Sequence, residues 1–435
     1  MPLLTQVGWN RMQHGALCAI LLTVASLPAQ NTAQTAPVSD WMHSPRVRAA
    51  MAKLTAEASA TTEEQIRITA VPAPPFGESA RGVYMSRLLS DAGLAVKTDD
   101  VGNVIGRRPG RSADSLILVA AHLDTVFPAG TDVRARREDG RIYAPGISDN
   151  GTGLAALVAV VRALRDANIQ TDSTILFVAD VGEEGEGNLR GMRKLVDTYG
   201  SQLRYVIAID GSATDYISNA ALASRRVEVT LTGPGGHSWS DFGAPNPVHA
   251  LARGIARFVK TPVPDVPRTS FNVGEIEGGT SVNSIPARAA MKVDLRSEAE
   301  PELGRLEATL RRDIQAGLDE EMAASRKRGL YSAAPLNLEF NVLGVRPGGE
   351  LAEDSPLLAS VRAADQYLGN RSRLERSSTD ANIPLAAGMQ SIAIGAGGQS
   401  ALAHSTGEWY DPQGRDLGLH RLLLTLLGVA GLPQE

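Results

Sequence analysis

The stretch LILVAAHLDTV, residues 116–126, joins an apolar run to polar residues of the kind that bind metals. Its first six residues include no polar side chain, which is typical of a strand buried on both faces of a parallel sheet. His122 and Asp124 follow where such a strand would end. Because loops at the carboxyl ends of parallel strands build the sites of α/β proteins, this stretch predicts both the fold class and the place of the site.

Strands and helices alternate around this stretch. We expect helices over residues 47–68, 79–92, 151–166 and 188–199, and strands over 115–121, 173–179 and 205–209. This alternation predicts βαβ units and a largely parallel sheet. With 435 residues, the chain is longer than one hydrophobic core usually supports, so we expect two domains. Residues 40–223 are interpreted as the first part of a catalytic, metal-binding domain.

The pattern changes near Arg225. Alternating apolar residues predict a strand with one exposed face, and further strands and helices are expected over 247–259 (helix), 269–276, 287–296, 301–327 (helix) and 337–342. We interpret residues 224–347 as an inserted α+β lid or dimerisation domain. The chain then returns to the catalytic domain, residues 348–435, with a helix over 355–367, a strand over 390–394 and a closing helix from 418.

The N-terminus has the pattern of a secretory signal peptide, assigned to residues 1–29. Arg11 and His14 precede an apolar run over 16–25, and cleavage after Ala25 or Ala29 fits the small residues there. The alternative is a membrane anchor, but about ten apolar residues fall short of the roughly 20 that a spanning helix needs. We therefore expect an exported protein, periplasmic or extracellular, with no stable membrane insertion after cleavage.

Composition narrows the chemistry further. The only cysteine, Cys18, lies in this apolar run, so the mature chain would have no disulfide, thiolate ligand or cysteine nucleophile. With 43 basic and 48 acidic residues and no long basic run, nucleic acid is not expected as a partner. The sequence contains no Gly-x-Ser-x-Gly motif, so a serine hydrolase with a nucleophile elbow is not expected. The glycines at 182–187 lack the spacing of a dinucleotide-binding motif, so a nucleotide-dependent enzyme is not expected either.

Five side chains in separate segments are candidate metal ligands: His122, Asp149, Glu184, Asp210 and His404. Each alone has a structural reading, such as a helix N-cap for Asp149 or a turn residue for Asp210. All five are expected at the same sheet edge, with His404 following the last strand, and this convergence favours a metal site. Three carboxylates and a bridging hydroxide carry about four negative charges, which two divalent ions would neutralise. Nitrogen and oxygen ligands suit zinc first, with cobalt or manganese as alternatives.

These residues lie in motifs that resemble the M20 metallopeptidase family. The motifs are HLDTV (122–126), SDNGTG (148–153), GEEG (182–185), GGHS (235–238), NSIP (283–286) and HS (404–405). The resemblance implies a dinuclear-metal exopeptidase domain with an inserted dimerisation domain. It also implies one zinc on His122, Asp149 and Asp210, and a second on Asp149, Glu184 and His404.

The same resemblance assigns roles to further residues. Glu183 would be the general base that activates a metal-bridged hydroxide. For Asp124 the reason is its spacing from His122, which is that of a carboxylate holding the second ring nitrogen of a histidine ligand. Asn283 would hold the substrate near the scissile group, and Arg296 would grip its free carboxylate. His237, on a glycine-rich turn, would complete the active site of the opposite subunit of a homodimer.

The substrate stays open at this point. A short peptide cleaved by a dipeptidase, tripeptidase or carboxypeptidase is the main hypothesis, and an N-acyl amino acid cleaved by a deacylase is the alternative. A catalytically silent peptide-binding protein is a third reading. Residues 377–382 form either the floor of the cleft or a structural loop.

Overall fold

The computed structural model describes residues 38–328 and 334–433. The predicted signal peptide, residues 1–29, and its cleavage site lie outside this range. Among the described residues, no helix is both long enough and apolar enough to cross a membrane.

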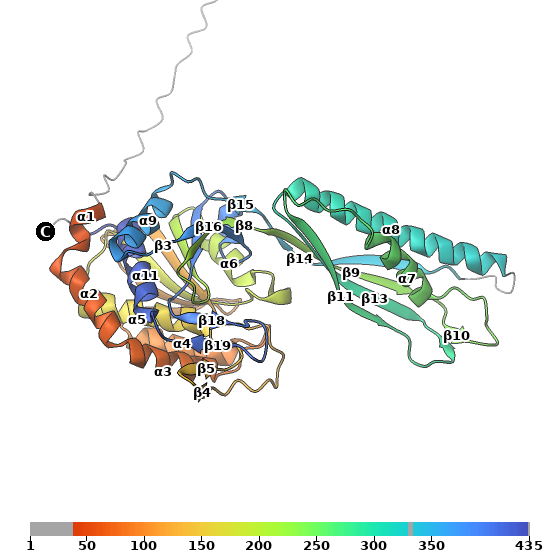
Figure 1. Ribbon diagram of the computed structural model, residues 1–435, viewed down its shortest axis with the longest axis horizontal. Coiled ribbons are helices and arrows are strands. Elements are labelled where there is room, and N and C mark those ends of the chain that lie inside the picture. The colour runs from red at the N-terminus through yellow and green to blue at the C-terminus, as the bar shows by residue number, and fades with distance from the viewer. Residues whose placement is uncertain (1–37, 329–333, 434–435) are drawn as a thin grey trace, which may run out of the picture. The chain divides into compact units, whose positions relative to one another are not determined.

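A central sheet of nine strands organises the catalytic part of the chain (Figure 1). Its middle is parallel, as predicted, and consists of β6 (Ser173–Asp180), β3 (Ser112–His122), β7 (Leu203–Ile209) and β17 (Gln390–Ile394). Antiparallel strands β2 (Val104–Arg108) and β1 (Ala95–Thr98) extend one edge. The other edge holds β8 (Tyr216–Ala221), β15 (Gly349–Glu350) and β16 (Arg373–Ser377).

Helices cover both faces of this sheet, which explains why the strands are apolar throughout. Along β3, Ile117 and Val119 pack in the core with α5, while Leu118 packs with α6 on the other face. This follows from the two-residue period of a strand. The first core also includes residues of α2 (Pro45–Ala56), α3 (Ala58–Thr69), α4 (Ser79–Asp91), α5 (Gly151–Asp166), α9 (Pro356–Leu368) and α11 (Arg415–Ala430). The second includes residues of α6 (Arg190–Tyr199) and α10 (Asn382–Ala386).

The long helix expected over residues 47–68 is in fact two helices. The helices α2 and α3 meet at Glu57, whose backbone leaves the helical region at φ −97° and ψ 8°. A short helix, α1 (Val38–Met42), precedes them. Periodicity alone did not reveal the break, because both helices bury apolar residues against the same core.

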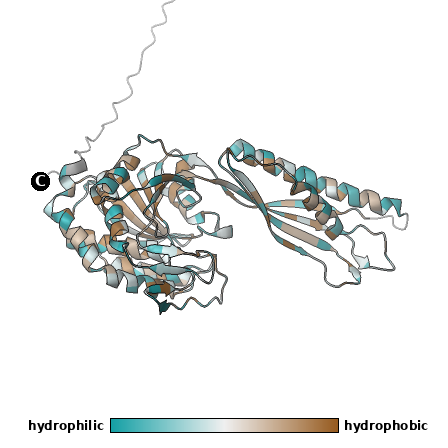
Figure 2. Ribbon diagram, in the orientation of Figure 1, coloured by the Kyte–Doolittle hydropathy of each residue, from teal (hydrophilic) through white to brown (hydrophobic). Residues whose placement is uncertain are grey.

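Residues from 223 to 346 build a separate antiparallel sheet with the order β11-β13-β9-β14. Its strands are β9 (Ala223–Thr232), β11 (Thr269–Gly278), β13 (Arg288–Ser297) and β14 (Asn337–Arg346). The helices α7 (Pro247–Phe258) and α8 (Glu300–Lys327) pack on one face and bury Val227, Val229 and Leu231 of β9. In α8, hydrophilic and hydrophobic residues alternate along the helix, as Figure 2 shows. A two-stranded ribbon, β10 (Gly236–His237) and β12 (Ser284–Ile285), belongs to the same region.

A third sheet carries the loop of His404. It consists of β4 (Arg136–Glu138), β5 (Arg141–Tyr143), β19 (Trp409–Asp411) and β18 (Gln399–Ala401). The expectation that His404 follows the last strand of the parallel sheet is corrected here, because β17 ends at Ile394 and β18 intervenes. None of these four strands was predicted, since strands of three residues are too short to show a period.

Candidate metal centre and active site

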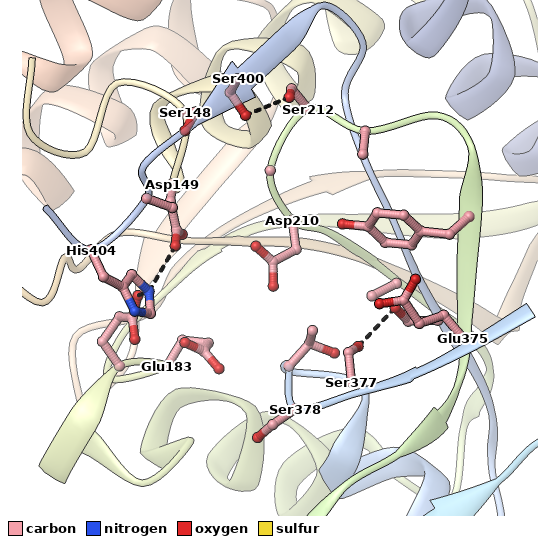
Figure 3. A pocket seen from close by; sticks show the side chains of 18 of the residues that line it. Ser148, Asp149, Glu183, Asp210, Ser212, Glu375, Ser377, Ser378, Ser400 and His404 are labelled. Atoms are coloured by element: carbon pink, nitrogen blue, oxygen red, sulfur yellow. Dashed lines mark hydrogen bonds and ion pairs between the residues drawn. The ribbon is translucent and has the colours of Figure 1, made fainter. Parts of the chain in front are cut away.

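The five candidate ligands come together although they lie in separate segments. His122 ends β3, Asp149 precedes α5, Glu184 follows β6, Asp210 follows β7, and His404 lies between β18 and β19. Ligand atoms of His122, Asp149 and Glu184 lie within 4.8 Å of one another. Asp149, Glu184, Asp210 and His404 also line a cleft of about 620 Å³. Figure 3 shows Asp149, His404 and Glu183 on one side of this cleft, with Asp210 facing them.

Asp149 lies between the two imidazoles. Its Oδ1 is 3.1 Å from Nε2 of His122, and its Oδ2 is 3.0 Å from Nε2 of His404. Asp210 Oδ1 lies 3.9 Å from Nε2 of His122, whereas Glu184 Oε1 lies 3.0 Å from Nε2 of His404. The side chains therefore form two groups that share Asp149. One group contains His122 and Asp210, and the other contains His404 and Glu184.

The donor set fits divalent cations. Nε2 of His122 and Oδ1 of Asp149 are buried without a hydrogen-bond partner, although they are only 3.1 Å apart. Buried polar atoms are normally satisfied, so two unsatisfied atoms that face each other suit a cation between them. Imidazole and carboxylate ligands without thiolates are those of zinc, cobalt and manganese sites.

Electrostatics supports the same reading. Hydrogen bonds to Asp149 and Glu184 raise the pKa of His404 to about 11. Burial by itself would raise the pKa of Asp149, but His122 and His404 lower it well below its usual range. The carboxylates thus attract positive charge strongly, and in the metal-free chain a proton on His404 provides part of it.

The Asp149 loop is held by Glu408, which the sequence interpretation missed. The Glu408 carboxylate accepts hydrogen bonds from the backbone N–H of Gly146, Ser148 and Asp149 and from the Ser148 hydroxyl. The side chain is fully buried, and burial raises its pKa. The only signal in the sequence is its nearness to His404, four residues earlier. Glu408 therefore fixes the loop that presents Asp149.

The helix after this loop is capped by Asn150 rather than by Asp149. Oδ1 of Asn150 accepts the Gly153 N–H, and its Nδ2 donates to the Ile209 carbonyl, which precedes Asp210. Asn150 therefore ties the two carboxylate loops together, and Asp149 is left free to face the imidazoles. The Asp149–Asn150 peptide bond is cis.

Asp124 contacts both His122 and the turn that carries Glu183 and Glu184. Its carboxylate accepts the backbone N–H of Glu183 at 3.1 Å and of Glu184 at 2.8 Å. The carboxylate of Asp124 was expected to hold Nδ1 of His122, but the backbone carbonyl oxygen of Asp124 lies nearer. Nδ1 is 3.1 Å from this carbonyl oxygen and 3.6 Å from the carboxylate. Asp124 thus positions the Glu183–Glu184 turn as well as the His122 ring.

Glu183 is buried beside the cluster, and its carboxylate contacts Arg346. Nη1 of Arg346 donates to Oε1 of Glu183 at 2.9 Å, and Nη2 donates to the Glu183 carbonyl oxygen. Burial raises the pKa of Glu183 to about 8, although the Arg346 charge opposes this shift. Sequence interpretation missed Arg346, because a single arginine at the end of an alternating strand looks like a surface residue.

Arg296 reaches the cleft, but Asn283 and His237 do not. Arg296 lines the cleft together with Arg226, and both contact Asp294, at 2.6 and 3.6 Å. His237 and Asn283 are exposed on the β10–β12 ribbon and do not line the cleft. Within one chain, the structure therefore brings together the predicted metal ligands, Glu183, Asp124 and Arg296, but not these two residues.

Residues 377–382 both line the cleft and support the surrounding structure, the two roles suggested from the sequence. Ser377, Ser378 and Thr379 line the cleft. Asn382 is buried and donates to the carbonyl oxygens of Leu222 and Pro347, where the chain enters and leaves the inserted sheet. The first half of the segment is therefore cleft wall, and the second half is structural.

The comparisons with known proteins agree with this geometry. Residues 118–426 match the model of peptidase family M20/M25/M40. An uncharacterized protein of Bacillus subtilis, YqjE, is 25% identical over 355 residues, covering 77% of this chain and 89% of that protein. Carboxypeptidase G2 of Pseudomonas sp. is 26% identical over 250 residues, covering 54% of this chain and 59% of that protein.

Solved structures share the fold. The aminopeptidase PepT of Bacillus cereus superposes with a TM-score of 0.65 at 22% identity, covering 86% of this chain and 99% of PepT. The dipeptidase Dug1p of Saccharomyces cerevisiae superposes with a TM-score of 0.71 at 13% identity, covering 89% of this chain and 99% of Dug1p. The family model, which spans most of the chain, and the cluster of metal-binding side chains lead to one conclusion. The chain belongs to peptidase family M20/M25/M40 and is a metal-dependent hydrolase that acts on amide bonds.

Proposed function

We propose that this enzyme is an exopeptidase that hydrolyses short peptides with two zinc ions. The observation that carries the proposal is the placement of Asp149, whose two carboxylate oxygens face two different histidines. One ion would be held by His122, Asp149 and Asp210, and the other by Asp149, Glu184 and His404. When bound, such ions polarise a scissile carbonyl and make water more acidic. The silent peptide-binding reading is set aside, because the chain belongs to a family of hydrolases.

Glu183 is the proposed general base. Its carboxylate lies at the cleft beside the metal ligands, and the backbone N–H groups of Glu183 and Glu184 are both fixed by Asp124. In this role Glu183 accepts a proton from the attacking water and delivers it to the leaving amine.

The charges of the cleft favour a peptide with both termini free. Among the residues that line the cleft, Arg226 and Arg296 share the single carboxylate of Asp294, which leaves one positive charge for a substrate carboxylate. Asp215 and Glu375, which also line the cleft, share the single guanidinium of Arg373, which leaves one negative charge for a substrate ammonium group. Figure 3 shows Glu375 across the cleft from Asp149 and His404. An N-acyl amino acid has a carboxylate but no ammonium group, so it matches only one of these two charges.

A panel of dipeptides, tripeptides and N-acetyl amino acids tests this choice. We expect free peptides to be cleaved with the higher kcat/KM, and zinc analysis to find two ions per chain. A relative supports the deacylase alternative: this chain is 30% identical over 241 residues to a succinyl-diaminopimelate desuccinylase of Methylibium petroleiphilum. Preference for the N-acetyl substrates would replace the peptidase proposal with that alternative. Arg296→Ala should raise KM for a free peptide about tenfold or more, since a charged hydrogen bond contributes about 1.5–3 kcal/mol.

We further propose a homodimer in which His237 acts in the partner's cleft, with Asn283 beside it. Nδ1 of His237 accepts the backbone N–H groups of Trp239 and Ser240 at 3.1 and 3.3 Å, so the neutral ring carries its proton on Nε2. The exposed Nε2–H is then a fixed donor, as needed to stabilise an oxyanion. Asn283 lies next to it, because its carbonyl oxygen accepts the Ser238 N–H at 2.9 Å.

Mixing two inactive variants tests this arrangement. His237→Ala and Glu183→Ala subunits should regain activity after exchange, because each mixed dimer has one cleft with both residues. Exchange of Glu183→Ala subunits with Asp149→Ala subunits is the matched control and should restore no activity, because each cleft of that mixed dimer still lacks either Glu183 or Asp149. Demonstrated exchange without recovery in the first mixture would refute the action in trans.

Export to the periplasm or the outside of the cell is likewise a proposal that rests on the sequence alone. Fractionation of cells that express the full chain should place the activity outside the cytoplasm, with residues 1–25 or 1–29 removed. A full-length protein recovered from the cytoplasm would contradict it.

A further inference from the structure

The loop that carries Glu183 is contacted along its length by the inserted sheet. This loop, residues 183–188, includes the short helix η1 (Gly185–Gly187). Its contacts are Arg346 to Glu183, Arg226 to the Gly185 carbonyl oxygen, Lys292 to Glu186 at 2.9 Å, and the Val345 N–H to Asn188 at 3.0 Å. The partners come from three different strands of the inserted sheet, β9, β13 and β14. The inserted sheet therefore holds this loop together with Asp124 of the catalytic part.

Among these contacts, the one made by Arg346 is buried and reaches the carboxylate itself. The side chains of Arg346 and Glu183 are 5% and 6% exposed. Among the described residues, Arg346 is also the hydrogen-bond partner that the structure gives to the Glu183 carboxylate, and its Nη1 bonds Ser378 of the cleft wall as well. The fork of donors on a guanidinium fixes both distance and direction.

We propose that Arg346 is a positioning residue for the reaction, through which the inserted sheet sets the place of the Glu183 carboxylate. The inference rests on the proposed role of Glu183 as general base. Arg346 holds both Oε1 and the backbone carbonyl of Glu183, so it fixes the side chain and the main chain of the same residue. Arg346 lines the cleft and also bonds Ser378, but it is not one of the proposed metal ligands.

The expected size of the effect follows from the geometry of proton transfer. A general base must lie within about 2.6–3.2 Å of the proton donor. A misplacement of about 1 Å lowers the rate about 10²-fold. Without Arg346, Glu183 keeps its backbone bonds to Asp124 but loses the partner of its carboxylate. The hydrogen bonds of Arg346 go to Glu183 and Ser378, so its loss removes no hydrogen bond from Arg296 or from the side chains of the five proposed metal ligands.

Steady-state kinetics of Arg346→Met and Arg346→Lys, both loaded with zinc, test the proposal. We expect Arg346→Met to lower kcat about 10²-fold, with KM changed less than about threefold and the zinc content unchanged. Arg346→Lys keeps one charged donor and should recover at least about tenfold of that loss. For Arg346→Ala, added guanidinium ion should restore part of kcat, whereas it should not restore Glu183→Ala. This rescue separates positioning from a purely structural role, which a soluble cation does not replace.

Arg225→Met is the matched control. Arg225 lies on β9 opposite Val345 in the ladder and forms ion pairs with Glu300 and Glu307 within the inserted region. We expect its kcat to stay within about twofold, because neither pair touches the cleft. The proposal is overturned if Arg346→Met keeps kcat within about twofold, or if lysine and guanidinium both fail to restore activity in folded, zinc-loaded protein. If Glu183→Ala itself remains active, the proposed function fails instead, so the two failures are distinguishable.

Discussion

The cluster of candidate metal ligands and the β10–β12 ribbon both carry residues from the sequence motifs, but the two regions differ in burial and in their distance from the cleft. Three of the five proposed metal ligands end or follow strands of the central sheet, and a fourth, Asp149, precedes α5. These four side chains are buried or half-buried and meet at one edge of the sheet. His237 and Asn283 lie on an exposed two-stranded ribbon and meet nothing in the cleft of their own chain. A parallel sheet brings distant segments together within one chain, whereas the exposed ribbon would complete a site only in the proposed homodimer.

The sharpest test of this contrast removes the shared ligand. Asp149→Ala should abolish the binding of both ions and lower kcat/KM by at least about 10³-fold, because catalysis by such ions supplies several kcal/mol. Inductively coupled plasma mass spectrometry of the purified variant would measure the zinc content. Asp172→Ala, directly before the opposite end of β6 and half-buried, is the control that should keep both zinc and activity. Full zinc occupancy in Asp149→Ala would show that the carboxylate does not bridge two ions.

The second test uses pH. In the metal-free chain the pKa of His404 is raised to about 11, so below that pH a metal must displace a proton. We expect zinc affinity to rise from pH 5 to pH 8 by up to about tenfold per pH unit for each proton released. The sign is opposite for the metal-free fold, where the ion pair stabilises fully below about pH 6.5 and this contribution is lost as the pH rises through 11. Calorimetric titration with zinc at several pH values measures the slope, and a flat profile would remove His404 from the ligand set.

A smaller effect is expected from Glu408→Gln. The amide keeps the shape but offers one acceptor oxygen instead of two to the N–H groups of Gly146, Ser148 and Asp149. Partners of metal ligands typically affect affinity 10–100-fold, so we expect a loss in zinc affinity of about that size. Competition with a fluorescent chelator would detect it. Unchanged affinity would mean that the Asp149 loop keeps its shape without this carboxylate.

The smallest effect is expected at the ribbon. Trp239 is 86% exposed, so Trp239→Ala should change the free energy of unfolding of the isolated subunit by less than about 0.5 kcal/mol. If the ribbon enters a partner's cleft, the same change should weaken the dimer, as measured by sedimentation at several concentrations. A large loss of subunit stability with an unchanged dimer would mean that the ribbon acts within its own chain.

Much of the catalytic part was predictable from local sequence. The helix over residues 151–166 and the strand over 390–394 have the predicted bounds, because the apolar run of each segment is flanked by polar or glycine residues. The largely parallel sheet and the family follow from the same pattern and from the motifs. Short antiparallel strands such as β18 and β19, and the break at Glu57, were not predictable, since they depend on neighbours that the local sequence does not contain.

By itself, the sequence determined which residue types could bind metal and that strand ends would carry most of them, because apolar periodicity and polar termini are local properties. Only the tertiary structure decided that Asp149 faces two histidines, that Glu408 holds its loop, and that Arg346 holds Glu183. Arg346 lies 163 residues from Glu183 along the chain, and Glu408 lies 260 residues from Ser148. Contacts between such distant residues are set by the packing of whole sheets and loops, and no local pattern encodes them.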